Sequence, residues 1–196
     1  MHYGFPSGCR DGTISPAAEA TGNLPMANYV TTLEENFGRK GLSLEVMATL
    51  SGAHSIGGSH CSNVFSPLYY SFNSNYSQDP FLDHAYANYL RSKCPRISPS
   101  GPNNQVVAVV SFDPSTPKTL DNHYYKNWGN HEGLLFSDQV LFTTTSTRKM
   151  VKNNAKHGNL WACKFAAAMV HMGSIEVVTA RGEIRKKCGF VNLEIF

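Results

Sequence analysis

The sequence has no long apolar run, no strong charge of one sign and no internal repeat. None of its segments approaches the roughly 20 consecutive apolar residues of a membrane span. The formal net charge is only +3, and no basic stripe alternates with aromatic residues as in many nucleic-acid-binding proteins. Met1 is not followed by the charged and then apolar segments of a secretory signal. We therefore expect neither a membrane span nor nucleic-acid binding, and no signal peptide in this chain.

The cysteines include no Cys-x-x-Cys pair, which argues against a zinc ribbon. There are five of them, and this odd number leaves at least one thiol unpaired within the chain. They are Cys9, Cys61, Cys94, Cys163 and Cys188. The length of 196 residues and the apolar fraction of 41% suit one globular domain with a sizeable core.

Helical spacing of apolar residues is the main pattern in the first third of the chain. Three such residues predict a first helix, namely Val30, Leu33 and Phe37. Gly41 is suited to cap its carboxyl end. Ser43 can cap a second helix that runs to about His54. Met47, Leu50 and His54 then fall on one face of that helix.

A third helix is predicted to begin with Asp79 and Pro80, which look like a cap and a first-turn proline. It ends before Cys94-Pro95, and its expected apolar side consists of Leu82, Tyr86, Tyr89 and Leu90. The β-branched run 106–112 predicts a short strand or a buried extended segment.

The last third of the chain predicts further helices and little sheet. The expected elements are a helix over 121–125, a helix capped by Ser146 or Thr147, and a helix marked by Phe165, Met169 and Met172 that Gly173 closes. The segments 133–142 and 182–188 stay ambiguous. The predicted fold class is mainly α.

His54 ends the second predicted helix and has two interpretations. It is either a core histidine with both ring nitrogens satisfied, or a metal or haem ligand whose other nitrogen is held by an acceptor. The pattern alone does not choose. A zinc site of His54, His60 and Cys61 is a third hypothesis, but their spacing does not place them together on one helix face.

The segment 50–57, Leu-Ser-Gly-Ala-His-Ser-Ile-Gly, resembles the proximal haem-ligand signature of the plant-type (class III) secretory peroxidases. Further segments resemble blocks of that family in the same order. They are Gly8-Cys9-Arg10-Asp11-Gly12 (usually Gly-Arg-Arg-Asp-Gly), Asn23-Leu24-Pro25, Phe112–Tyr125, Gly133–Gln139, Phe165–Val170 and Gly182–Arg185. The resemblance covers nearly the whole chain and implies a haem-peroxidase fold.

The resemblance implies roles for three residues around haem b. His54 would bind the iron through its ε nitrogen and donate its δ N–H to the carboxylate of Asp138, which increases electron donation by the imidazole. By its sequence context alone, Asp138 is a carboxylate at a helix start. Pro25 would lie near the haem edge, where aromatic reductants dock.

A proximal calcium site is also implied. Its ligands would be Ser55, Asp113, Thr116, Thr119 (through its carbonyl) and Asp121. These oxygen donors suit the ion. The family usually has Thr at the position of Ser55, and the hydroxyl is kept. Without the resemblance, the same residues indicate a turn rich in Asx and hydroxyl caps.

Cys61 and Cys94 match a disulfide of the family. It would close a loop of 33 residues, worth about 3–4 kcal/mol if the loss of unfolded-chain entropy dominates. Cys188 matches another family cysteine whose partner would lie upstream of Met1. Cys9 and Cys163 match none and are expected to be free, buried thiols.

The resemblance implies peroxide-dependent oxidation of phenolic donors by one-electron steps, in a protein that is monomeric and secreted or vacuolar. The family's distal histidine and arginine occur in an Arg-x-x-Phe-His pattern that this sequence lacks. We therefore expect residues 1–196 to form a single partial domain, the haem-proximal part without the distal N-terminal helices. The alternative is a catalytically impaired fragment that binds haem and calcium.

Overall fold

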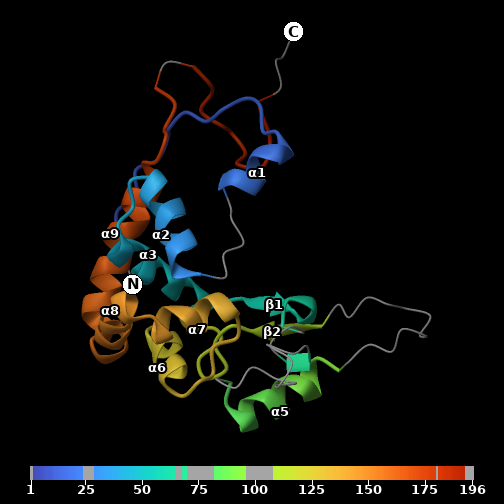
Figure 1. Ribbon diagram of the computed structural model, residues 1–196. Coiled ribbons are helices and arrows are strands. Elements are labelled where there is room, and N and C mark those ends of the chain that lie inside the picture. The colour runs from blue at the N-terminus through green and yellow to red at the C-terminus, as the bar shows by residue number, and fades with distance from the viewer. Residues whose placement is uncertain are drawn as a thin grey trace, which may run out of the picture.

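The computed structural model describes residues 2–23, 29–64, 68–69, 82–95, 108–179 and 181–192 (Figure 1). Its helices are α1 (Ala17–Asn23), α2 (Val30–Arg39), α3 (Leu44–Leu50), α5 (His84–Lys93), α6 (His123–Gly129), α7 (Phe136–Thr143), α8 (Thr145–Lys156) and α9 (Gly158–Gly173). Two 3-10 turns, η1 (Ser51–Ser55) and η2 (Cys61–Asn63), and two strands, β1 (Gly58–His60) and β2 (Val109–Ser111), complete the described elements. The mainly α fold class is confirmed. No described helix has the length and apolar character that a membrane crossing requires.

The signals that predict α2 and α3 are confirmed. Gly41 follows α2 in the left-handed conformation, with φ of +74°, which glycine adopts without strain. Ser43 caps α3, because its Oγ accepts a hydrogen bond from the backbone N–H of Val46 at 3.3 Å. The second helix does not reach His54 as an α-helix. It ends at Leu50, and the chain tightens into η1.

The predicted cap of the third helix needs correction. Within the described residues, α5 begins at His84, and the carboxylate of Asp83 accepts from the backbone N–H of Tyr86 at 2.8 Å. Asp79 and Pro80 lie outside the described residues. Tyr89 is 46% exposed, so it does not belong to the buried side of the helix.

The predicted cap of α8 is also wrong. The helix begins at Thr145, and Thr144 is its N-cap residue. Thr147 lies inside the first turn and is fully buried. Its hydroxyl donates to the carbonyl of Leu141 at 2.6 Å, so it ties α8 to α7.

The larger core lies where α3, α6, α8 and α9 meet. Trp128, Trp161, Tyr124 and Tyr125 are its largest fully buried side chains. The Tyr125 hydroxyl lies 2.8 Å from the carbonyl oxygens of Ala48 and Thr49, and the Trp161 indole donates to Thr49 at 3.2 Å. Because the last carbonyls of an α-helix lack partners within the helix, these polar groups stabilise the end of α3, just before η1.

A second core surrounds the Cys61–Cys94 disulfide. Its other buried members are Val64, Leu68, Leu82, Tyr86, Ala87, Leu90, Val110 and Leu134. β1 and β2 pair antiparallel beside it, with Ser59 opposite Val110. This pairing brings the segment after η1 next to the segment that leads to Phe112.

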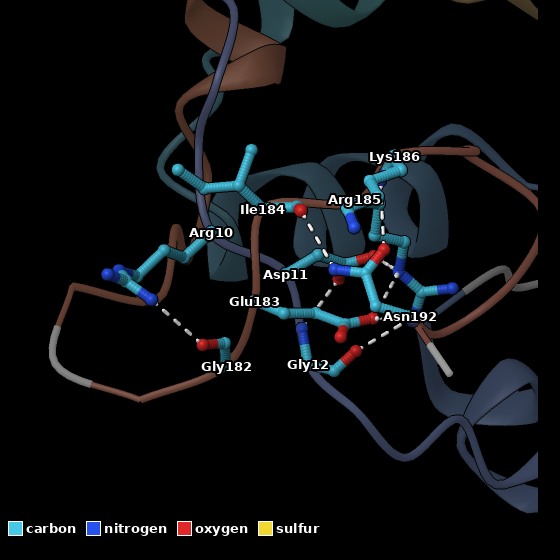
Figure 2. Close-up of polar contacts among 9 residues, drawn as sticks. All are labelled: Arg10, Asp11, Gly12, Gly182, Glu183, Ile184, Arg185, Lys186 and Asn192. Atoms are coloured by element: carbon cyan, nitrogen blue, oxygen red, sulfur yellow. Dashed lines mark hydrogen bonds and ion pairs between the residues drawn. The ribbon is translucent and has the colours of Figure 1, made fainter. Parts of the chain in front are cut away.

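The first and last described parts of the chain are joined into a seam, which we define as residues 10–12, 178 and 182–185. Asp11 and Glu183 exchange backbone hydrogen bonds, both of 2.9 Å. Figure 2 shows Arg185 reaching across, where it bonds the carbonyl of Gly12 at 2.8 Å and pairs with Asp11 at 2.8 Å. The ambiguous segment 182–188 therefore forms an isolated bridge instead of a regular element. In Figure 1 the seam lies beside α1, away from α6 and α7.

Candidate functional site

A glycine two residues before His54 sets how η1 packs. A Cβ at Gly52 would lie 2.6 Å from the Tyr125 hydroxyl and 2.7 Å from a ring carbon of Trp161. Only a residue without a side chain lets η1 approach α6 and α9 this closely. His54 follows at the edge of this contact, with 38% of its side chain exposed.

Two aromatic side chains hold the His54 ring. Phe112, just after β2, stacks on it with 4.3 Å between ring centroids and 14° between planes. Tyr124 of α6 meets it edge-on at 5.9 Å and 89°. Contacts on a face and on an edge together restrict rotation of the imidazole.

The carboxylate of Asp138 joins three polar groups. Its Oδ1 lies 3.1 Å from His54 Nδ1 and accepts from the Tyr124 hydroxyl at 2.6 Å. Its Oδ2 accepts from the backbone N–H of Leu135 at 3.2 Å. Asp138 lies in the first turn of α7 and is 2% exposed. Both interpretations of Asp138 hold geometrically: it is a helix-start carboxylate, and it lies within hydrogen-bond distance of His54.

This arrangement changes the acidity of His54 and Tyr124. Burial lowers the pKa of His54, but the hydrogen bond to Asp138 and its negative charge outweigh burial and raise that pKa above 6.5. Burial and then the charge of Asp138 raise the pKa of Tyr124 well above its ordinary value. The neutral phenol therefore donates to Asp138. In the part of the chain that the structure describes, no hydrogen bond reaches the other ring nitrogen of His54, Nε2.

Asp113 is the buried centre of the neighbouring loop. It is fully buried, and its Oδ1 accepts from the backbone N–H groups of Ser115 and Thr116 at 2.7 and 3.0 Å. The side-chain amide of Asn127, on α6, donates to the same oxygen at 2.8 Å. The loop is thus fixed to the helix that carries Tyr124.

The five residues of the expected calcium site come together in a group that we call the oxygen-donor loop, which consists of residues 113–121 with Ser55 of η1 beside them. The Thr116 hydroxyl lies 3.1 Å from Asp113 Oδ2 and 3.2 Å from Asp121 Oδ1. Ser55 Oγ accepts from the backbone N–H of Asp121 at 3.3 Å, and Thr119 donates its N–H to the Thr116 carbonyl. One hydroxyl proton cannot serve two carboxylates at once, so a cation would suit this cluster.

The oxygen donors of this cluster favour some metal ions over others. Among the described residues no group of three or more His, Cys, Asp or Glu side chains could hold a metal ion. Two carboxylates with hydroxyls and a carbonyl are hard oxygen donors, which fit calcium and do not fit zinc. The zinc hypothesis is wrong in any case, because Cys61 is bonded to Cys94.

The disulfide expected from the resemblance is formed. Cys61 and Cys94 are both fully buried, with 5.4 Å between their Cα atoms. Cys9, Cys163 and Cys188 are free and exposed, so the expected burial of Cys9 and Cys163 is wrong. Pro25, the expected residue at the reductant site, lies outside the described residues.

Three residues of the site have no role in the sequence-based prediction. Phe112 and Tyr124 belong to a matched segment, but the sequence gives no sign that both contact the His54 ring. Asn127 follows Tyr124 by three residues and therefore lies near the same helix face. That spacing is the one available signal, and it does not identify Asp113 as the partner.

Two surface hollows of about 270 Å³ each lie along α9, and neither is lined by His54. One is lined by the N-terminal segment (Phe5, Pro6 and Cys9) and by α9. The other lies between α3 and α9. The histidine–carboxylate pair and the oxygen-donor loop are therefore separate from both.

A histidine fixed by a buried carboxylate, next to an oxygen-donor loop, defines the class of site, and known proteins identify its family. The peroxidase family model matches residues 1–157. Peroxidase 5 of Vitis vinifera is 45% identical over 194 residues, which cover 98% of this chain and 57% of that protein. Peroxidase 51 of Arabidopsis thaliana is 38% identical over 97% of this chain and 56% of its own length. Peroxidase 1 of Zea mays is 38% identical over 100% of this chain and 53% of its own length.

The chain belongs to the peroxidase family. It spans about half the length of the curated relatives it matches.

Proposed function

We propose that this chain forms the haem-proximal part of a plant-type peroxidase, with His54 as the axial ligand of haem b iron. One observation carries the proposal. The His54 ring is held at Nδ1 by the buried Asp138 carboxylate, at 3.1 Å, while Nε2 has no hydrogen-bond partner among the described residues. A neutral imidazole bonded in this way keeps a lone pair on Nε2 for a metal.

The residues around His54 would serve the ligand in different ways. Asp138 draws the Nδ1 proton toward itself and makes Nε2 a stronger electron donor. Phe112 covers one face of the ring and limits its rotation. When bound, haem supplies the electron-transfer chemistry with peroxide, and a strongly donating axial histidine favours it.

The oxygen-donor loop would hold calcium beside this ligand. Its donors are Ser55, Asp113, Thr116, the Thr119 carbonyl and Asp121. Ser55 directly follows His54 and accepts from the backbone of Asp121. Calcium in the loop would therefore restrain the backbone of the haem ligand.

The proposed reaction of the whole enzyme is oxidation of phenolic donors by hydrogen peroxide, one electron at a time, with Pro25 near the donor. The buried disulfide suits an oxidising compartment, in agreement with the secreted or vacuolar location proposed for it. A chain that binds haem and calcium without turnover is the second candidate, favoured by the lack of an Arg-x-x-Phe-His pattern in these 196 residues.

Haemin reconstitution tests the ligand. The purified chain is titrated with haemin, and the Soret band is recorded for wild type, His54→Ala and a control, His60→Ala, which removes an exposed histidine six residues away. We expect a Soret shift in wild type and in the control and its loss in His54→Ala. An equal shift in all three proteins would overturn the proposed ligand.

Peroxide and a phenol are then added to the loaded protein. Turnover well above that of free haemin, dependent on His54, would support a peroxidase active in this chain. A Soret shift with turnover no better than free haemin would favour the second candidate.

A further inference from the structure

The Tyr124 hydroxyl and His54 Nδ1 both lie close to the same carboxylate oxygen of Asp138. It donates to Asp138 Oδ1 at 2.6 Å, and His54 Nδ1 lies 3.1 Å from that atom. The distance from the hydroxyl to His54 Nδ1 is longer, 3.4 Å. Two donors therefore share one oxygen of a buried anion.

The number of protons on each group decides the direction of each hydrogen bond. A phenol has one proton to donate, and the shorter contact assigns it to Asp138. An ionised carboxylate only accepts, so the proton between His54 and Asp138 belongs to Nδ1. Both bonds therefore draw on the electron density of Oδ1.

We propose that Tyr124 is a positioning residue that sets how strongly Asp138 pulls on the His54 proton, and thereby how strongly Nε2 donates to a bound metal. The proposal rests on the function proposed above. A hydrogen bond to a carboxylate stabilises its charged form and makes it a weaker base. Tyr124 thus moderates the electron donation that Asp138 gives to His54.

The surroundings of Tyr124 hold its hydroxyl in place. The side chain is 1% exposed, and its ring packs against Trp128 at 4.4 Å and Tyr125 at 5.3 Å, with interplanar angles of 68° and 67°. The phenol cannot turn toward solvent without disturbing this packing. Its bond to Asp138 is therefore a fixed feature of α6.

Two changes at position 124 test the proposal in opposite directions. Tyr124→Phe removes the donor and keeps the ring, and 3,5-difluorotyrosine at position 124 makes the hydroxyl more acidic and so a stronger donor. Tyr125→Phe is the matched control, because it removes a buried hydroxyl on the same helix that bonds the carbonyls of Ala48 and Thr49 instead.

The first readout is the proton NMR shift of His54 Nδ1–H in the full chain without haem. We expect it to move downfield in Tyr124→Phe, since the bond to Asp138 strengthens, and upfield with difluorotyrosine. The control should leave it in place. Equal or same-direction shifts in the two altered proteins would overturn the proposal. Because the fluorinated protein keeps the hydroxyl, the test does not depend on Tyr124→Phe folding.

The second readout is the reduction potential of the haemin-loaded chain. We expect a more negative potential in Tyr124→Phe and a more positive one with difluorotyrosine. Unchanged potentials alongside a normal Soret shift would overturn the role of Tyr124 and leave the haem ligand intact. A normal Soret shift in His54→Ala would instead overturn the proposed function. The NMR shift of His54 Nδ1–H in the two proteins altered at position 124 would still test the role of Tyr124.

Discussion

Asn127 donates its side-chain amide to the carboxylate of Asp113 at 2.8 Å, and both residues are almost completely buried. The side-chain oxygen of Asn127, Oδ1, also accepts from the Ser115 hydroxyl at 3.1 Å. One side chain of α6 therefore joins two points of the proposed calcium loop.

Replacing Asn127 by Ala should weaken this loop. The change leaves the buried carboxylate of Asp113 with one partner fewer and removes the acceptor of the exposed Ser115 hydroxyl. We expect a loss of about 1–3 kcal/mol in the free energy of unfolding. Urea unfolding with and without calcium measures it, and the calcium-dependent gain should shrink as well. Asn130→Ala, at an exposed position just after α6, is the control. Equal losses in both variants would contradict the role of Asn127.

Replacing Gly52 by Ala should displace η1. The added Cβ would contact the Tyr125 hydroxyl and the Trp161 ring at 2.6–2.7 Å, and overpacking of this kind costs about 1–3 kcal/mol. We expect a lower unfolding midpoint and a weakened haemin Soret shift. Gly38→Ala is the control, because a Cβ there meets nothing within 4 Å and alanine is the better helix former. A Gly52→Ala variant as stable as Gly38→Ala would refute the packing argument.

Opening the Cys61–Cys94 bond by a Cys61→Ser/Cys94→Ser change should lower the free energy of unfolding by about 3–4 kcal/mol. The loop spans 33 residues, and the same positions lie in the second core. Chemical denaturation under oxidising conditions measures the loss. Cys163→Ser changes an exposed free thiol and should stay within about 0.5 kcal/mol of wild type.

Stability should fall at alkaline pH in part through Tyr125. Burial is the main cause that raises the pKa of this phenol above 10 in the folded chain. Between the unfolded and folded pKa values, the folded chain keeps a proton that the unfolded chain has lost. The contribution of this phenol to the free energy of unfolding is therefore fully present below pH 10 and is lost as the pH rises above 10. Denaturation midpoints from pH 8 to 11 should decline less steeply in Tyr125→Phe. A slope equal to that of wild type would contradict this assignment, and the exposed Tyr29→Phe serves as control.

The sequence predicted the helices whose signals are local. Apolar spacing and a left-handed glycine are enough for α2, and Ser43 is enough for the start of α3. α1 was missed because none of its residues is buried, so it has no apolar face to detect. The change from α3 to η1 could not be foreseen, since it depends on contacts of Gly52 with α6 and α9.

Of the candidate site, the proposed haem ligand and its carboxylate partner could be predicted, but the contacts around them could not. His54 and Asp138 are 84 residues apart, and periodicity gives no reason to pair them. The family resemblance named both residues. It did not name Tyr124. That two donors share one carboxylate oxygen follows from interatomic distances and from the number of protons on each group, and residue types alone reveal neither.

The seam also has a consequence for the order of folding. Arg10 and Gly182 form a hydrogen bond across 172 residues of chain, so its formation must overcome one of the largest loop-closure entropies in the molecule. Contacts of such high sequence separation form slowly compared with local helices. We expect the seam to form late and to open early, which would make its amides exchange with deuterium before those of α6 and α9.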